Sequence, residues 1–301
     1  LFTSIYLVYT LTPSIALVPA RYFYFHIIAY LQSLAPSINS GPASYFYFLR
    51  KMPNVARLAA REVLLQPLPS LRVGQNHTTS SAIHRVDFVG TLVPWPNFEG
   101  DVIAAFTSQT WNTQTIDVII SGLGAGDPVS EEHRPVTTCL QAQGRLLRVG
   151  DFKASREAAR SGYSRVPDLV VLDNGAATKV VGEVKAPWPV SYVRMLSRGV
   201  RLFQMGQEHQ LRRILGQVAR YMKDLNVRHA FLSTYEETMF LRKIDTTTGW
   251  ALQFSPVITH DPQYSNPMRT ITTRQGLFYL ALLGQTAQPF ATRPSRSQWT
   301  T

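Results

Sequence analysis

The residues of this chain best suited to chemistry lie between residues 166 and 188, in the run VPDLVVLDNGAATKVVGEVKAPW. Within it, Asp168 and Glu183 supply two carboxylates, and Lys185 supplies an ammonium group two residues further on. Carboxylates that are held together repel each other unless one takes up a proton or a cation lies between them. Oxygen ligands of this kind suit a hard divalent ion, so the pattern predicts a Mg²⁺ site that Mn²⁺ could also fill.

A β-hairpin would bring these side chains together. Two runs rich in strand-forming residues, 168–173 and 178–186, flank the turn sequence NGAA. If the residues on either side of this turn oppose each other, the same register places Asp168 opposite Glu183. Opposed residues project to one face of the sheet, and the period of two in a strand adds Lys185 to that face.

Two acids, an amine and a divalent ion on one patch indicate phosphodiester hydrolysis. The ion would polarise a phosphoryl oxygen and lower the pKa of a bound water. The ammonium group of Lys185 would orient that water or neutralise the charge that develops during the reaction.

Three short motifs in the chain resemble those of the PD-(D/E)XK nuclease superfamily. Pro167-Asp168 resembles its PD, and Glu183-Val184-Lys185 resembles its (D/E)XK element on the neighbouring strand. Gln217 and Tyr221, in LGQVARYMKDL, are similar to the QxxxY element of the RecB-like and lambda-exonuclease-like branches, and their spacing places them on one helix face. The chain also resembles uncharacterised PD-(D/E)XK-like proteins that are common in fungal genomes.

This resemblance implies an α/β fold with a restriction-endonuclease-like αβββαβ core, in which helices flank a mixed central sheet. It implies that Asp168, Glu183 and the carbonyl group of Val184 bind the metal, that Lys185 assists the attacking water, and that Gln217 and Tyr221 support the site. The family core also has a further acidic residue on the helix before the hairpin. Three residues are candidates for it here: Glu131, Glu132 and Glu157.

The net charge favours a polyanionic partner. Lys and Arg number 30 against 19 Asp and Glu, which gives a net charge of +11 and a pI near 9.9. Nucleic acid is the expected partner, DNA before RNA, and a membrane surface is the alternative. Between residues 191 and 225 the basic residues are Arg194, Arg198, Arg201, Arg212, Arg213, Arg220 and Lys223. They would either follow a phosphate backbone or form an ordinary solvated helix surface.

The cysteine and histidine content excludes several other classes. The single cysteine, Cys139, cannot form an internal disulfide, which favours an intracellular location, nuclear or cytoplasmic. The seven histidines never occur at the close spacings typical of a zinc enzyme. Residues 1–20 are apolar enough to keep a signal peptide or membrane anchor as an alternative, although Pro13 and Pro19 interrupt the run.

The composition along the chain predicts four segments. Residues 1–50 form an apolar N-terminal extension, and residues 51–81 form a helix, in VARLAAREVLLQ, followed by a linker. Residues 82–285 form the nuclease-like domain, with its core at about 135–243, and residues 286–301 form a frayed tail. Within the domain we expect a helix that starts at Pro135, a helix over residues 206–225 and a C-terminal helix over residues 271–283.

Two other functions fit the same sequence. One is a catalytically inactive relative that keeps the fold and binds nucleic acid through its basic surface. The other is a protein-interaction module, anchored through the apolar N-terminus. The sequence leaves open the oligomeric state and the choice between endonuclease and exonuclease action.

Overall fold

The structure is a computed structural model, and it describes residues 54–68, 86–121, 128–159, 166–185, 193–247, 249–260, 270–287 and 295–301. All of these belong to one unit of the chain, Pro53–Thr301. The expected N-terminal extension (1–50) and most of the expected linker lie outside the described residues.

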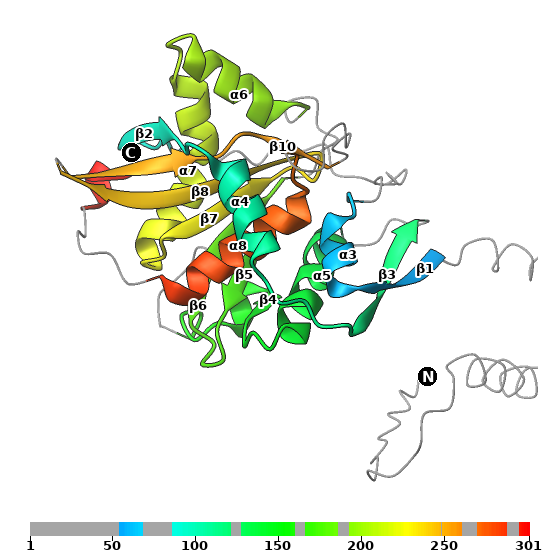
Figure 1. The fold of residues 1–301 in the computed structure, drawn as a ribbon. Coiled ribbons are helices and arrows are strands. Elements are labelled where there is room, and N and C mark those ends of the chain that lie inside the picture. The colour runs from blue at the N-terminus through cyan, green and yellow to red at the C-terminus, as the bar shows by residue number, and fades with distance from the viewer. Residues whose placement is uncertain are drawn as a thin grey trace, which may run out of the picture. The chain divides into compact units, whose positions relative to one another are not determined.

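Strands and helices are interspersed along the chain, with a run of four strands, β7 to β10, before the last α-helix (Figure 1). In order they are β1 (Asn54–Ala59), α3 (Ala60–Leu65), β2 (Thr91–Pro94), α4 (Phe98–Thr107), β3 (Thr115–Ser121), α5 (Pro128–Ala142), β4 (Arg148–Gly150), η1 (Phe152–Ala154), β5 (Leu169–Leu172), β6 (Thr178–Val184), α6 (Met195–Gln204), α7 (His209–Asp224), β7 (His229–Ser233), β8 (Glu237–Thr246), β9 (Gly249–Phe254), β10 (Ile258–Thr259), α8 (Thr273–Thr286) and η3 (Arg296–Gln298).

A mixed, largely antiparallel sheet forms the centre of this unit. Its strands run in the order β2-β9-β8-β7-β6-β5-β4, and β10 adds to β8. The pairs β2/β9 and β6/β7 are parallel, and the other neighbours are antiparallel. Strands β1 and β3 form a separate two-stranded sheet. The chain is therefore an α/β protein, as the sequence predicts.

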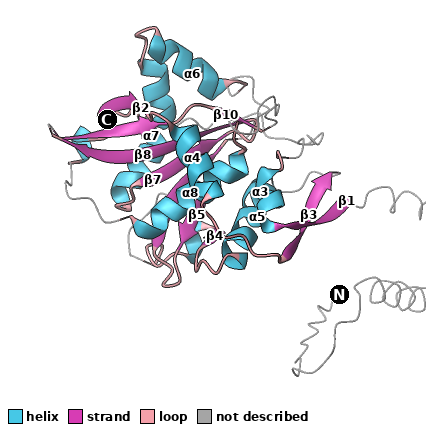
Figure 2. Ribbon diagram, viewed as in Figure 1, coloured by secondary structure: helices cyan, strands magenta, loops and turns pink. Residues whose placement is uncertain are grey.

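Helices cover both faces of the sheet (Figure 2). Helices α6 and α7 pack with Val170, Leu172 and Val181 in one apolar core. Helices α3, α4, α5 and α8 pack with Leu169 and Val171 in a second core on the other face. Because successive residues of a strand point to opposite faces, a strand between two helical layers is apolar throughout, which explains the run LVVL of β5.

The same alternation decides which face the polar residues of the hairpin occupy. Glu183 and Lys185 share the parity of Val181, and Asp168 shares that of Val170. All three therefore lie on the face that α6 and α7 cover, at the end of the sheet where β6 ends.

The run VARLAAREVLLQ differs from the single helix that its spacing predicts. Its first half is strand β1, which pairs with β3 and places Arg57 3.2 Å from Asp117 across the two strands. The helix begins only at Ala60, where the Glu62 side chain accepts a hydrogen bond from the Ala59 backbone N–H. Pairing with a strand some sixty residues away overrides the local helical period.

Helix α5 also starts earlier than predicted. It begins at Pro128, so Pro135 lies inside the helix rather than at its first turn. Both prolines match the helix-start signal, and the upstream one marks the actual start.

The end of the chain packs on the domain, whereas the composition predicts a frayed tail. Trp299 is fully buried, its ring stacks on that of Trp250 with centroids 4.4 Å apart, and its carbonyl accepts a hydrogen bond from Val89. Thr300 forms a bridge with Phe88. The buried side chain of Trp299 therefore anchors residues 295–301, most of which are polar.

The remaining predicted elements agree with the structure to within a few residues. The hairpin strands are β5 and β6, the helix expected over 206–225 is α7, and the C-terminal helix is α8. None of the helices in the described ranges has both the length and the apolar character that crossing a bilayer requires.

Candidate functional site

The β5/β6 hairpin has the predicted register in the half that carries the candidate site. Leu169 pairs with Gly182 and Val171 with Val180, as expected. The turn differs, because Leu172 rather than Asp173 pairs with Thr178. A bulge near the turn accounts for this difference of one residue. The pairing at the other end of the hairpin is unchanged, so Asp168 and Glu183 still project to the same face of the sheet.

Asp168 lies directly before β5, on the exposed side of the candidate site. Its Oδ2 accepts a hydrogen bond of 2.8 Å from the backbone N–H of Val184. This bond ties the start of β5 to the end of β6. It holds the carboxylate of Asp168 where β5 begins and β6 ends, and this residue is exposed to solvent.

Glu183 supplies the second carboxylate, and its residue is only 3% exposed. Its Oε1 accepts a hydrogen bond from the ammonium group of Lys185. Its Oε2 is buried and has no hydrogen-bond partner among the described residues. A buried carboxylate oxygen normally has a partner, because desolvation without one is costly.

Burial raises the pKa of the Glu183 carboxyl to about 7, and the nearby carboxylate of Asp168 adds to this effect. Lys185 acts in the opposite direction but does not cancel the shift. Near neutral pH this acid therefore exists in both protonation states, and a cation beside Oε2 would favour the ionised one.

Helix α7 supplies the side chains that hold Lys185. The Lys185 Nζ donates to Gln217 Oε1 at 3.0 Å, and Gln217 Nε2 donates to the Tyr221 hydroxyl oxygen at 2.7 Å. The Tyr221 hydroxyl then donates to the carbonyl of Val166 at 3.2 Å. The chain of hydrogen bonds thus runs from the end of β6, along α7, and back to the residues just before β5.

Tyr221 stays neutral in this position. Burial raises the pKa of its hydroxyl, and the neighbouring carboxylates of Glu183 and Asp168 raise it further. A neutral hydroxyl can both accept from Gln217 and donate to a carbonyl, which is the role it has here.

The structure thus brings all five predicted side chains to one place: Asp168, Glu183, Lys185, Gln217 and Tyr221. Two supporting groups were not predicted. The carbonyl of Val166 receives the Tyr221 hydroxyl, and the carbonyl of Ser233 in β7 receives the backbone N–H of Lys185 at 2.8 Å. Both are backbone groups, for which the sequence carries no residue-specific signal.

The further acidic residue expected from the resemblance is not identified. Glu157 is buried, but its Oε2 accepts from the backbone and the hydroxyl of Thr178, at the opposite end of β6 from Glu183. The side chains of Glu131 and Glu132 lie outside the described ones. In the described part of the chain, no three His, Cys, Asp or Glu side chains come together as a metal-binding group.

The donor set that is present fits a hard cation with an incomplete protein shell. Asp168 is accessible, Glu183 has an oxygen that no described residue contacts by a hydrogen bond, and the two carboxylates are close enough to perturb each other. Magnesium is commonly held by only one or two carboxylates, with water and substrate oxygens completing its coordination.

No protein-family model, no curated protein and no solved structure matches this chain.

Proposed function

We propose that the chain is a divalent-metal-dependent nuclease of the PD-(D/E)XK type. The observation that carries the proposal is the pairing of an accessible carboxylate, Asp168, with a buried one, Glu183, whose Oε2 lacks a partner among the described residues. A lysine that is held between Glu183 and Gln217 lies beside them. Two carboxylates and an amine in one place supply the kinds of group that metal-assisted phosphodiester hydrolysis uses.

The order of elements around the site supports the same proposal at the level of the fold. Helix α5 is followed by the antiparallel strands β4, β5 and β6, then by α7 and by β7, which is parallel to β6. This is the αβββαβ order that the resemblance implies, with α6 as an additional helix between β6 and α7.

Three groups would hold Mg²⁺ or Mn²⁺: the carboxylates of Asp168 and Glu183, and the carbonyl of Val184. In an extended strand the N–H and C=O of one residue point to the same side. The N–H of Val184 points to Asp168, so its carbonyl lies on the side of β6 that faces Asp168. When bound, the metal would lower the pKa of a water molecule and polarise a phosphoryl oxygen.

The other side chains would position the attacking water and neutralise negative charge on the phosphate. Lys185 is fixed by two hydrogen bonds, so its ammonium group can orient an attacking water and offset negative charge on the phosphate without first losing side-chain freedom. Gln217 and Tyr221 would act as positioning residues, because they contact Lys185 and the backbone before β5.

A catalytically inactive nucleic-acid-binding relative is the second candidate, and two observations favour it. Lys185 is ion-paired with Glu183, and the described residues hold no third acidic or histidine ligand near the two carboxylates. Such a protein would keep the fold and the basic surface without hydrolysis.

Cleavage assays with the purified chain distinguish these candidates. Labelled single- and double-stranded DNA and RNA are incubated with Mg²⁺, Mn²⁺ or EDTA. We expect cleavage with either metal and none with EDTA. Salt-dependent binding without cleavage under any condition would favour the inactive relative, and the absence of any nucleic-acid affinity at low salt would favour a protein-interaction module.

The variants Glu183→Gln and Lys185→Met test the assignment of the site. We expect each to reduce the cleavage rate by at least about a hundredfold, because each removes a charge that acts on the transition state. Glu183→Gln should also abolish the rise in melting temperature that Mn²⁺ produces in the parent protein. Glu157→Gln is the matched control, since it changes a buried glutamate whose carboxylate contacts Thr178, at the other end of β6 from Glu183. Equal loss of activity in Glu157→Gln would contradict the assignment.

A further inference from the structure

The α6–α7 helix pair, with the residue before α6, carries seven Lys and Arg residues. Of its seven basic residues, two are neutralised within the pair, because Arg212 lies 2.6 Å from Glu208 and Lys223 lies 3.4 Å from Asp224. Arg212 also donates to the carbonyls of Phe88 and Gly90, which gives it a structural role.

Arg220 is buried, so it is not available to a macromolecular partner. Four arginines remain, and all four are exposed: Arg194, Arg198, Arg201 and Arg213. None of the four forms an ion pair with a described residue. The two acids of this segment, Glu208 and Asp224, are already paired with Arg212 and Lys223. The carboxylate of Glu237 in β8 accepts hydrogen bonds from the first turn of α6.

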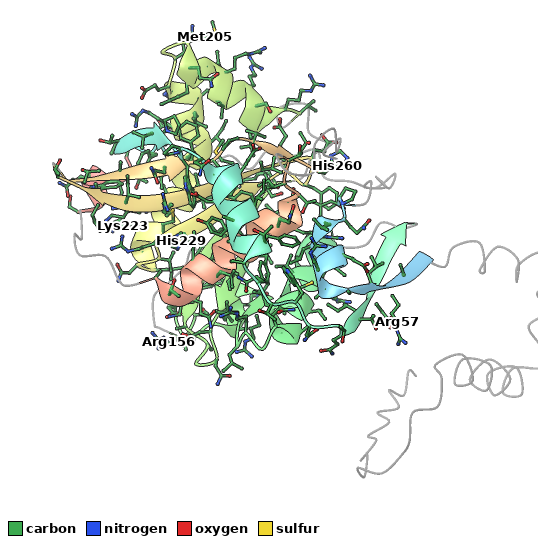
Figure 3. The ribbon with its side chains drawn as sticks, in the orientation of Figure 1. Arg57, Arg156, Met205, Lys223, His229 and His260 are labelled. Atoms are coloured by element: carbon green, nitrogen blue, oxygen red, sulfur yellow. The ribbon has the colours of Figure 1, made fainter. Side chains whose placement is uncertain are left out.

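Three of the four arginines lie on α6 or directly before it, and we call them the arginine row. Arg198 and Arg201 are three residues apart and share one face of the helix, and Arg194 is the residue that precedes its first turn. The opposite face contains Gly199, which packs against Leu211 and Ile214 of α7. The arginine row therefore points to solvent, and the exposed Met205 marks the end of the same helix in Figure 3.

The fourth arginine lies on α7, the helix that supplies Gln217 and Tyr221 to the candidate site. Arg213 precedes Gln217 by one helical turn on the same face of α7, so their Cβ atoms lie about 5–6 Å apart. Gln217 in turn contacts Lys185 at 3.0 Å. Arg213 is thus an exposed arginine one helical turn from the residue that contacts Lys185.

The N-terminal end of α6 also lies at the site end of the sheet. Its first turn is held by Glu237, which accepts a hydrogen bond of 2.9 Å from the backbone of Leu196. Glu237 begins β8, and its carbonyl accepts from Thr234, directly after the Ser233 that pairs with Val184. The arginine row therefore starts near the strand ends that carry Glu183 and Asp168.

We infer that this face, defined by Arg194, Arg198, Arg201 and Arg213, binds the sugar–phosphate backbone of a nucleic acid strand and leads it to the carboxylate pair. The inference rests on the proposed function for its substrate class. Arginine suits the role because its planar fork pairs with two phosphate oxygens at once. The four arginines and the carboxylate pair would then bind neighbouring parts of the same nucleic acid strand.

A binding experiment without catalysis tests this inference. The full chain, in EDTA, is titrated into fluorescently labelled single-stranded and duplex DNA, and the affinity is measured by anisotropy over a range of salt concentrations. For Arg198→Gln/Arg201→Gln we expect binding about tenfold weaker, and a slope of log K against log[salt] that is less steep by about 1.4–1.8.

The matched control is Arg134→Gln/Arg148→Gln, which removes the same two charges from exposed positions on α5 and β4. We expect this control to change the affinity by less than about twofold. Equal weakening in the two double variants would overturn the inference, because it would mean that net charge alone drives binding. Equal affinity of the parent chain for poly-glutamate and for DNA would overturn it as well, in favour of an acidic protein partner.

Arg213→Gln separates this inference from the proposed function. We expect it to weaken binding in EDTA and, with Mg²⁺, to raise KM while leaving kcat nearly unchanged. If the face binds DNA but the chain never cleaves it, the proposed nuclease activity is wrong and the inference about the face holds. If the chain cleaves DNA and the arginine variants bind as well as the parent, the inference about the face is wrong and the activity holds.

Discussion

Glu183 is a buried acid that titrates near neutral pH, and this has a consequence for stability. Its pKa in the folded chain is about 7, above the ordinary value of 4.5, so folding favours its protonated form. Its contribution to stability is therefore fully present below about pH 4.5 and is lost as the pH rises through 7. The loss is on the order of 3 kcal/mol in the free energy of unfolding, from the shift between 4.5 and about 7.

Urea unfolding at pH 5 and pH 8, in EDTA, measures this effect. We expect the parent chain to lose stability between the two pH values and Glu183→Gln to lose much less, because glutamine has no proton to release. Glu157→Gln should keep the loss seen in the parent. The same pH dependence in the parent and in Glu183→Gln would mean that other groups cause it.

At the residue scale, the sequence also predicted which side chains meet. The carboxylates and the amine follow from the alternation of a short hairpin, and Gln217 and Tyr221 follow from helical spacing. Two properties of Glu183 were not predictable: its burial, and the lack of a hydrogen-bond partner for its Oε2 among the described residues. Both depend on how α7 covers the end of β6.

At the scale of elements, the position of α7 depends on a close approach to the segment before β2. At Gly216 a Cβ atom would lie 1.8 Å from the carbonyl oxygen of Val86, which is backbone and cannot move aside. Alanine normally stabilises a helix relative to glycine by about 1 kcal/mol. Here we expect Gly216→Ala to destabilise the protein instead, by at least about 1–3 kcal/mol, because α7 must shift.

The midpoint of urea unfolding tests this expectation, with cleavage activity as a second measure because a shift of α7 would move Gln217. Gly150→Ala in β4 is the control, since a Cβ atom at Gly150 meets nothing within 4 Å. A Gly216→Ala variant at least as stable as the parent would show that the approach of the two backbones is not as close as described.

Strand β1 shows where element prediction failed. Its residues follow a helical period, but β3 offers a complete set of backbone partners and an opposite charge across the ladder. A pattern within one segment carries no information about a partner strand elsewhere in the chain.

At the scale of the whole domain, one tryptophan fixes the end of the chain. Trp299 is fully buried, lies against the rings of Phe88 and Trp250, and belongs to the same core as α7 and β6. We expect Trp299→Ala to cost about 3–5 kcal/mol in the free energy of unfolding, as for other large-to-small changes in a core.

Chemical denaturation measures this cost, with Ser297→Ala, an exposed residue of the same segment, as the control. We expect the control to change stability by less than about 0.5 kcal/mol. If both variants unfold like the parent, the last residues do not contribute to the core.

The sequence by itself determined the class of fold, the hairpin and the identities of the residues that could share a cation, because these depend on local periods and on short-range register. The tertiary structure alone decided which face of the sheet is closed by α7, and therefore that Glu183 is buried while Asp168 stays accessible. It also decided that Arg198, Arg201 and Arg213 are exposed and form no ion pair with a residue that the structure describes. Burial and charge pairing depend on contacts between residues far apart in the chain, and no local pattern encodes those contacts.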